Sequence, residues 1–262
     1  MITPIRAMLN EAYKSLLHLW SYRYNTLAEM VQRGLSFLTI GFLLGKGHWE
    51  APQMAFILCG WIMTFYARTI LFQVNDGITE EARSGTLEQM YMSPVSSGFL
   101  LLGRVFAILL VATLMVSLSA IVLSILVGIQ LPLRWEALPI IALTLAGVFG
   151  FSFLLGGAAL VYKSVHSLAD LTQDLLLFVN GTFISIALLP DWLRTIGLVL
   201  PTTYGITVLR AVVLNGSSLG ALINNHSLLL LTAHSAAYFF GGWLFYAWCE
   251  HFARQQGSLG QY

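Results

Sequence analysis

Four charged residues lie inside apolar stretches long enough to cross a membrane, where their chemistry could serve proton transfer or pairing. Arg68 and Asp174 lie about seven residues from one end of their stretches, or ~10 Å of helix. Arg104 and Asp170 lie slightly closer to the ends. Because ionisable groups in membrane helices normally turn inward and pair, we expect the two arginines to neutralise the two aspartates as a structural clamp. A proton or ion relay is the alternative, which arginines disfavour because they keep their protons near neutral pH.

Other patterns that could bind a nucleotide or perform catalysis are incomplete. Residues 41–46 begin with glycine and end with lysine, but a phosphate-binding loop needs four residues between its glycines and a Ser or Thr after the lysine. The Gly-Phe-Ser at residues 150–152 lacks the following glycine of a membrane serine protease motif. His226 and His234 are interpreted as interfacial or core groups. We expect no catalytic residue, metal site or cofactor in this chain.

The long polar break at residues 75–97 contains a predicted short helix with a start and a stop. Thr86 can accept a hydrogen bond from the backbone N–H of Gln89, whose side chain can reach back to Thr86, which is the capping-box arrangement. Pro94 ends the helix because it lacks an N–H and restricts the residue before it.

This short helix carries an apolar face surrounded by acids. Leu87, Met90 and Tyr91 are spaced so that they share one side of the helix. The acids of the segment are Asp76, Glu80, Glu81 and Glu88. We interpret the segment as a helix that binds in a complementary apolar groove on another protein. A helical turn at the lipid headgroups is the alternative, which the acids disfavour beside anionic lipid.

The composition is that of an integral membrane protein. The chain is 57% hydrophobic and 10% charged, with a mean hydropathy of +0.77, whereas soluble domains carry roughly 25% charged residues. Its 262 residues leave room for about six helical spans with short connections, which excludes a large soluble domain. The net charge of +1 gives no indication of nucleic-acid binding.

The predicted fold class is an all-α membrane protein with six transmembrane helices in a single domain. The predicted spans are residues 31–45, 52–74, 99–129, 138–162, 168–189 and 227–249. Residues 4–28 repeat apolar side chains every three and four positions but are too polar to span, so we expect an amphipathic helix along the membrane interface.

Residues 190–216 contain two apolar segments of about ten residues, too short to cross a bilayer. Pro201 separates them, and Tyr204 begins the second. We expect an external re-entrant hairpin covered by protein, since exposed helix ends would leave backbone groups unpaired in lipid. Arg210 would then lie near the outer surface.

Lysine and arginine set the predicted orientation. They gather near the N-terminus, residues 75–97, residues 163–167 and the C-terminal tail, and are fewer in the other loops. The positive-inside rule therefore places both termini and residues 75–97 in the cytoplasm.

The order of these elements resembles the ABC-2 type permeases of ATP-binding-cassette exporters, over essentially the whole chain. The most specific motifs are Gly85-Thr86-Leu87-Glu88-Gln89 with Ser93-Pro94, and Pro-Thr-Thr-Tyr-Gly-Ile-Thr-Val-Leu-Arg at residues 201–210.

The resemblance implies a coupling helix at residues 75–97, seated in a separate cytoplasmic ATPase subunit that binds ATP and Mg and is present in two copies. The implied ATPase contacts are Glu81, Thr86, Leu87, Glu88, Met90 and Tyr91. It also implies a permease dimer, homodimeric or heterodimeric, whose first and fifth spans face a central pathway. The residues assigned there are Gly41, Gly45, Gly181 and Ser185, with Pro201, Tyr204 and Arg210 in the external hairpin.

An amphipathic, lipid-linked or drug-like substrate fits the apolar, aromatic spans better than a small ion, and the expected location is the bacterial inner membrane. Two other classes stay open. A secondary transporter would need broken helices in repeated halves, and an intramembrane enzyme would need a nucleophile or metal cluster.

Overall fold

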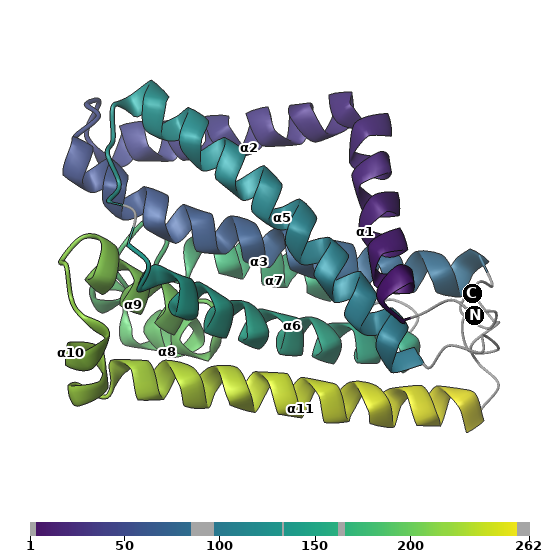
Figure 1. Ribbon diagram of the computed structural model, residues 1–262. Coiled ribbons are helices and arrows are strands. Elements are labelled where there is room, and N and C mark those ends of the chain that lie inside the picture. The colour runs from purple at the N-terminus through teal and green to yellow at the C-terminus, as the bar shows by residue number, and fades with distance from the viewer. Residues whose placement is uncertain (1–3, 85–96, 133, 162–165, 256–262) are drawn as a thin grey trace.

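The computed structural model describes residues 4–84, 97–132, 134–161 and 166–255, which form helices and short connections (Figure 1). In chain order the helices are α1 (Pro4–Ser21), α2 (Arg23–Leu44), α3 (Ala51–Ser84), α5 (Ser97–Val127), α6 (Ala137–Val161), α7 (His166–Phe178), the 3-10 turn η1 (Ile186–Leu188), α8 (Asp191–Val199), α9 (Thr203–Val213), α10 (Leu219–Asn224) and α11 (Ser227–Gln255). The predicted all-α class is confirmed in this part of the chain.

Five of the described helices contain a stretch long and apolar enough to cross a membrane. These stretches are Arg23–Leu44, Ala51–Val74, Gly103–Val127, Ala137–Ala159 and Ser227–Phe252. The pair α8 and α9 is apolar as well, but bends by 89° at the break between the two helices. The described residues therefore contain five candidate crossings, or six if the bent pair is one span, which is the pattern of a multi-pass membrane protein.

The first span begins earlier than predicted. The N-terminal helix ends at Ser21 rather than residue 28, and α2 starts at Arg23 rather than residue 31. The 15 residues of the predicted span would reach only ~23 Å, whereas the 22 residues of α2 reach ~33 Å, which matches the hydrocarbon core of about 30 Å.

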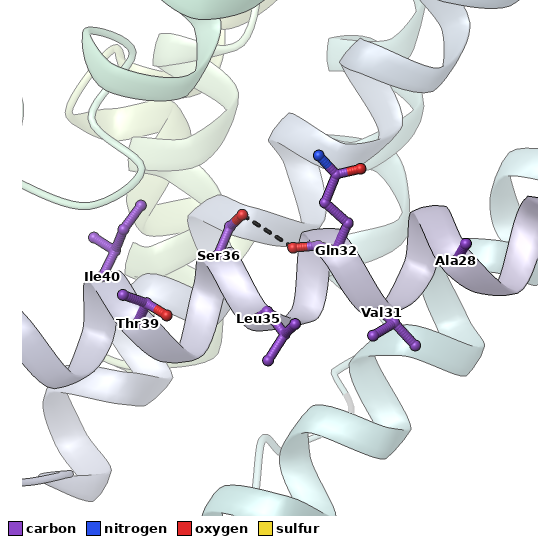
Figure 2. Close-up of a pocket in the computed structure, with 7 residues that line it drawn as sticks. All are labelled: Ala28, Val31, Gln32, Leu35, Ser36, Thr39 and Ile40. Atoms are coloured by element: carbon purple, nitrogen blue, oxygen red, sulfur yellow. Dashed lines mark hydrogen bonds between the residues drawn. The ribbon is translucent and has the colours of Figure 1, made fainter.

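One side of α2 lines an open groove (Figure 2). The residues that line it recur every three and four positions along the helix: Ala28, Val31, Gln32, Leu35, Ser36, Thr39 and Ile40. Only 11% of the α2 span is buried within the chain, against 72% for α3. The helix α2 therefore lies at the periphery of the protomer, with a face available to lipid or to another protein.

The prediction of a continuous fifth span at residues 168–189 is wrong. The helix α7 has 13 residues, or ~20 Å, too short to cross a bilayer, and residues 179–185 are not helical. Gly181 adopts a φ of +89°, and the backbone N–H of Thr182 donates to the Asn180 side-chain oxygen at 3.0 Å. This local turn competes with helix continuation, as asparagine side chains commonly do.

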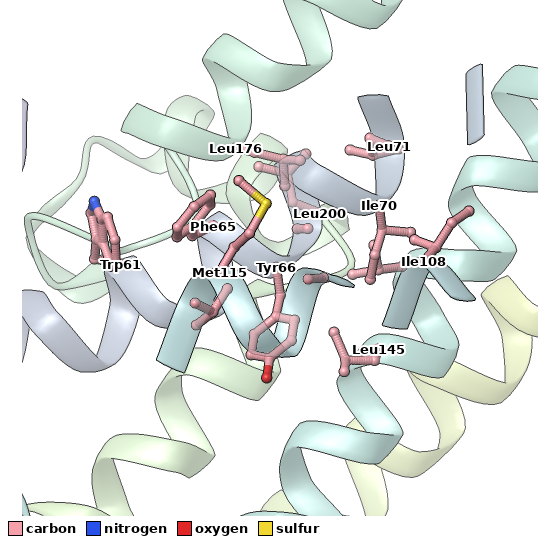
Figure 3. Close-up of a cluster of buried hydrophobic side chains, with 14 of the residues drawn as sticks. Trp61, Phe65, Tyr66, Ile70, Leu71, Ile108, Met115, Leu145, Leu176 and Leu200 are labelled. Carbon is pink, nitrogen blue, oxygen red and sulfur yellow. The ribbon is translucent and has the colours of Figure 1, made fainter. Parts of the chain in front are cut away.

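The hydrophobic core is centred on α3, which packs between α5 and α6 and also contacts α2, α7 and α9. Figure 3 shows the buried Trp61, Phe65 and Tyr66 of α3 against Met115 of α5 and Leu176 of α7. Because α3 touches elements from most of the chain, a movement of this helix would displace many of them.

The helices α6 and α11 form the most extensive pair and run side by side along the molecule (Figure 1). Glycines allow the close approach: a side chain at Gly147 would lie 3.2 Å from Ser235, and one at Gly157 would lie 3.1 Å from Tyr246. Small residues at such contacts are typical of membrane helix pairs, where van der Waals packing drives association.

Candidate functional site

The predicted ATPase contacts lie mostly outside the described residues. Thr86, Leu87, Glu88, Met90 and Tyr91 all fall there. Glu81 belongs to the last turns of α3. This helix leaves its apolar stretch at Val74 and continues to Ser84, which carries the chain ~15 Å further along the same axis.

Two members of the predicted charge clamp influence each other, and the clamp as a whole stays a prediction. Asp174 of α7 acts electrostatically on Arg68 of α3, without a direct ion pair between these two described side chains. The helix α7 packs on α3. Arg104 lies on α5 and Asp170 on α7, two helices that share no comparable contact in the described part of the chain. The packing of α7 on α3 brings Asp174 near Arg68, and the role of the four residues as a clamp stays a prediction.

Sequence reasoning missed Arg33 as a member of this cluster. Its guanidinium pairs with Glu29 at 3.7 Å, donates to the Thr69 hydroxyl at 3.0 Å and lies 4.4 Å from the centre of the Phe65 ring. It also lies close enough to Arg68 to repel it. The predicted start of the first span at residue 31 put Arg33 at a helix end, whereas the observed start at Arg23 places it well inside α2.

Arg33 and Arg68 line a small cavity between α2, α3 and the end of α7. Its volume is about 50 Å³, and its α2 and α3 walls are Arg33, Ser36, Trp61, Thr64, Phe65 and Arg68. Leu177 and Phe183 close the side toward α7. A water needs roughly 10–15 Å³ of such space, so the cavity has room for a few waters or one small charged group.

A buried polar network continues from this cavity into the interior. Thr64 and Thr182 join their hydroxyls at 2.5 Å, and the Asn180 amide donates to the hydroxyl of Thr64 at 2.8 Å and to that of Thr202 at 3.1 Å. All four side chains are buried. Buried polar groups are costly without partners, so this network holds residues 179–185 against α3 and the start of α9.

Arg210 is buried within the protein, with 8% of its surface exposed, and its expected depth near the outer membrane surface stays a prediction. Its guanidinium donates to the carbonyls of Gly181 and Thr182, each at 2.7 Å, and of Phe56 at 3.0 Å. Gly181 and Thr182 lie outside the helices, so their carbonyls have no intrahelical donor and are strong acceptors for the guanidinium. A Cβ at Gly60 would lie 2.6 Å from the guanidinium, so glycine leaves the space for it.

Of the predicted hairpin, α9 is largely buried, whereas most of α8 is exposed, including Trp192 at 67% and Val199 at 58%. Pro201 is buried between α8 and α9, and the Tyr204 ring lies 4.9 Å from the ring of His234 on α11. The Tyr238 hydroxyl donates to the carbonyl of Val199 at the end of α8. Two short helices separated by Pro201 are as predicted; their re-entrant position in a membrane stays a prediction.

The residues assigned to a dimer pathway have roles within one chain. A Cβ at Gly41 would lie 2.5 Å from the sulfur of Met54, so this glycine admits α3 close to α2. Gly45 caps α2, with its N–H on the Gly41 carbonyl. Gly181 supplies the positive φ of the broken segment, and Ser185 precedes η1. Their exposure to a second copy is a prediction that stays open.

The described part of the chain consists of long apolar helices packed around α3, with a broken helix held by buried polar groups. This is the architecture of a multi-pass helical membrane protein. The family model for the ABC-2 type transporter matches residues 9–214. The chain therefore belongs to this family and is a permease, the membrane component of an ABC transporter, which implies association with an ABC ATPase subunit. No curated protein matches the chain.

Proposed function

We propose that the chain is the permease of an exporter that moves an amphipathic, lipid-linked or drug-like substrate out of the cytoplasm. A separate cytoplasmic subunit binds ATP with Mg and hydrolyses the ATP, and two copies of it serve a permease dimer in the bacterial inner membrane. The single observation that carries the proposal is the family match over residues 9–214.

The continuity of α3 supports a mechanism in which a movement of the ATPase subunit is transmitted to the membrane spans. This helix is continuous from Ala51 to Ser84, so its cytoplasmic end and its buried span form one stiff element. The proposed coupling helix, with Leu87, Met90 and Tyr91 on its apolar face, follows directly after α3 in the chain. A push by the ATPase on this segment would tilt α3, and the elements packed on α3 would follow, which is a two-state change biased by ATP.

The α2 groove supports the position of the export pathway. The groove is lined mainly by apolar and hydroxyl-bearing residues, and α2 is the least buried of the five candidate spans. A second permease copy at this face would enclose a seam suited to an amphipathic substrate. Gly181 and Ser185 would line the seam from the broken segment, as the family resemblance implies.

The experiment is ATP-dependent efflux from cells or vesicles that contain this permease and its ATPase subunit. We expect Leu87→Asp to abolish efflux and to release the ATPase on purification, because a carboxylate cannot enter an apolar socket. Gln130→Asp, an exposed position in the loop between α5 and α6, is the matched control and keeps both. Undiminished efflux with Leu87→Asp, or efflux without any ATPase, would favour a secondary transporter instead.

A further inference from the structure

The cavity between α2, α3 and α7 has two positive charges in its wall and no carboxylate among the residues that line it. The neighbouring acids, Glu29 and Asp174, lie outside the lining, and Asp174 is exposed. Arg33 and Arg68 repel each other across this space. The lining of the cavity is therefore positively charged, with Glu29 and Asp174 as neighbouring counter-ions outside it.

The two arginines differ in how they are satisfied. The Arg33 guanidinium is already paired with Glu29, donates a hydrogen bond to Thr69 and lies over the Phe65 ring. Arg68 makes no hydrogen bond within the described part of the chain, although Asp174 acts on it electrostatically. A guanidinium inside a membrane span without hydrogen-bond partners is energetically unfavourable. Hydrogen bonds from the Arg68 N–H groups to a ligand would therefore stabilise the complex.

Apart from the hydroxyls of Ser36 and Thr64, the rest of the wall is apolar, and the space is small. Trp61, Phe65, Leu177 and Phe183 supply aromatic and aliphatic surface. The volume of about 50 Å³ suits one charged group and excludes a whole amphiphile, whose apolar part must lie outside the cavity. The planar fork of arginine matches phosphate oxygens in a bidentate arrangement, which makes phosphate the anion that this pair fits best.

We propose that this cavity binds the phosphate head group of a lipid-like amphiphile, held by Arg68 with Arg33 beside it. The proposal rests on the proposed function, because it names the head-group chemistry of the exported amphiphile. The apolar tail would lie along the exposed side of α2, where Leu35 is 58% exposed. Asp174 would be the counter-ion of Arg68 when the site is empty.

The test measures the binding of radiolabelled dodecyl phosphate to the purified full-length chain in phosphatidylcholine nanodiscs, with empty nanodiscs subtracted. We expect Arg68→Gln to bind about tenfold more weakly, the effect of losing one or two charge-assisted hydrogen bonds. Arg194→Gln, at an exposed position of α8, is the matched control and binds as the unsubstituted chain does. Equal binding by Arg68→Gln, once its folding is verified by thermal unfolding, overturns the proposal.

A second measurement needs no variant and so does not depend on folding. Dodecyl phosphate should bind the unsubstituted chain at least about tenfold more tightly than dodecyltrimethylammonium, which has the same tail and the opposite charge. Equal affinities overturn the proposal. Inorganic phosphate at equal concentration should fail to displace dodecyl phosphate; displacement would mean that the site takes free phosphate, and the amphiphile assignment would be wrong. Because none of these measurements involves ATP, their failure would leave the export proposal and its Leu87→Asp test untouched.

Discussion

The Arg210 side chain connects three segments that lie far apart in the chain. It joins α9 to the carbonyl of Phe56 on α3 and to the carbonyls of Gly181 and Thr182 in the broken segment. Its guanidinium also lies 3.4 Å from the centre of the Phe56 ring. The charge is compensated by carbonyl dipoles and an aromatic face rather than by a carboxylate, among the residues that the structure describes.

Removing this guanidinium should destabilise the protomer. We expect Arg210→Met to lower the free energy of unfolding by about 3 kcal/mol, because the buried carbonyls of Gly181 and Thr182 lose their donor and the carbonyl of Phe56 loses one hydrogen bond. The measurement is the unfolding of the purified chain in mixed micelles with rising SDS. Arg194→Met, which removes an exposed guanidinium from α8, should unfold with the unsubstituted chain. If the two variants unfold together, the Arg210 contacts do not hold the fold.

Among the elements, α3 is the one that could transmit a movement furthest, since it runs without interruption from the core to the proposed coupling segment. A proline in its extension should uncouple the two ends, because proline inside a helix costs about 3 kcal/mol and introduces a kink. We expect Asp76→Pro to reduce ATP-dependent efflux more than tenfold while the ATPase subunit still copurifies, with ATP hydrolysis and efflux measured on the same vesicles. Asp76→Ala removes the same carboxylate and keeps the helix, so equal efflux by the two variants would contradict a rigid α3.

The broken fifth element shows where sequence patterns fail to predict an element. Residues 168–189 are apolar enough to be read as a span, and α7 does begin there. The helix stops because Asn180 turns its side chain onto the backbone N–H of Thr182 and because Arg210 binds the exposed carbonyls. The asparagine and glycine at residues 180–181 were a local signal, but the acceptor role of the carbonyls depends on a residue about thirty positions away.

At the scale of the whole molecule, the face of α2 is the surface on which a dimer would form. We expect a bismaleimide to cross-link two copies through Leu35→Cys, which lines the α2 groove, in membranes that contain the complex. Ile125→Cys on α5 is a control of similar exposure, at 75% against 58% for Leu35. The native Cys59 and Cys249 are buried. Dimer bands on a denaturing gel from the α5 position, with none from α2, would place the dimer interface elsewhere.

The sequence by itself determined that this is a multi-pass helical membrane protein, because hydropathy and span length act locally and add along the chain. It also determined the two short helices around Pro201, since a proline and the length of each apolar run are visible without any partner. Only the tertiary structure decided that Arg33 and Arg68 share a cavity and that Arg210 points inward to carbonyls. These contacts depend on the register between helices distant in sequence, and a shift by one residue turns a helical side chain by about 100°.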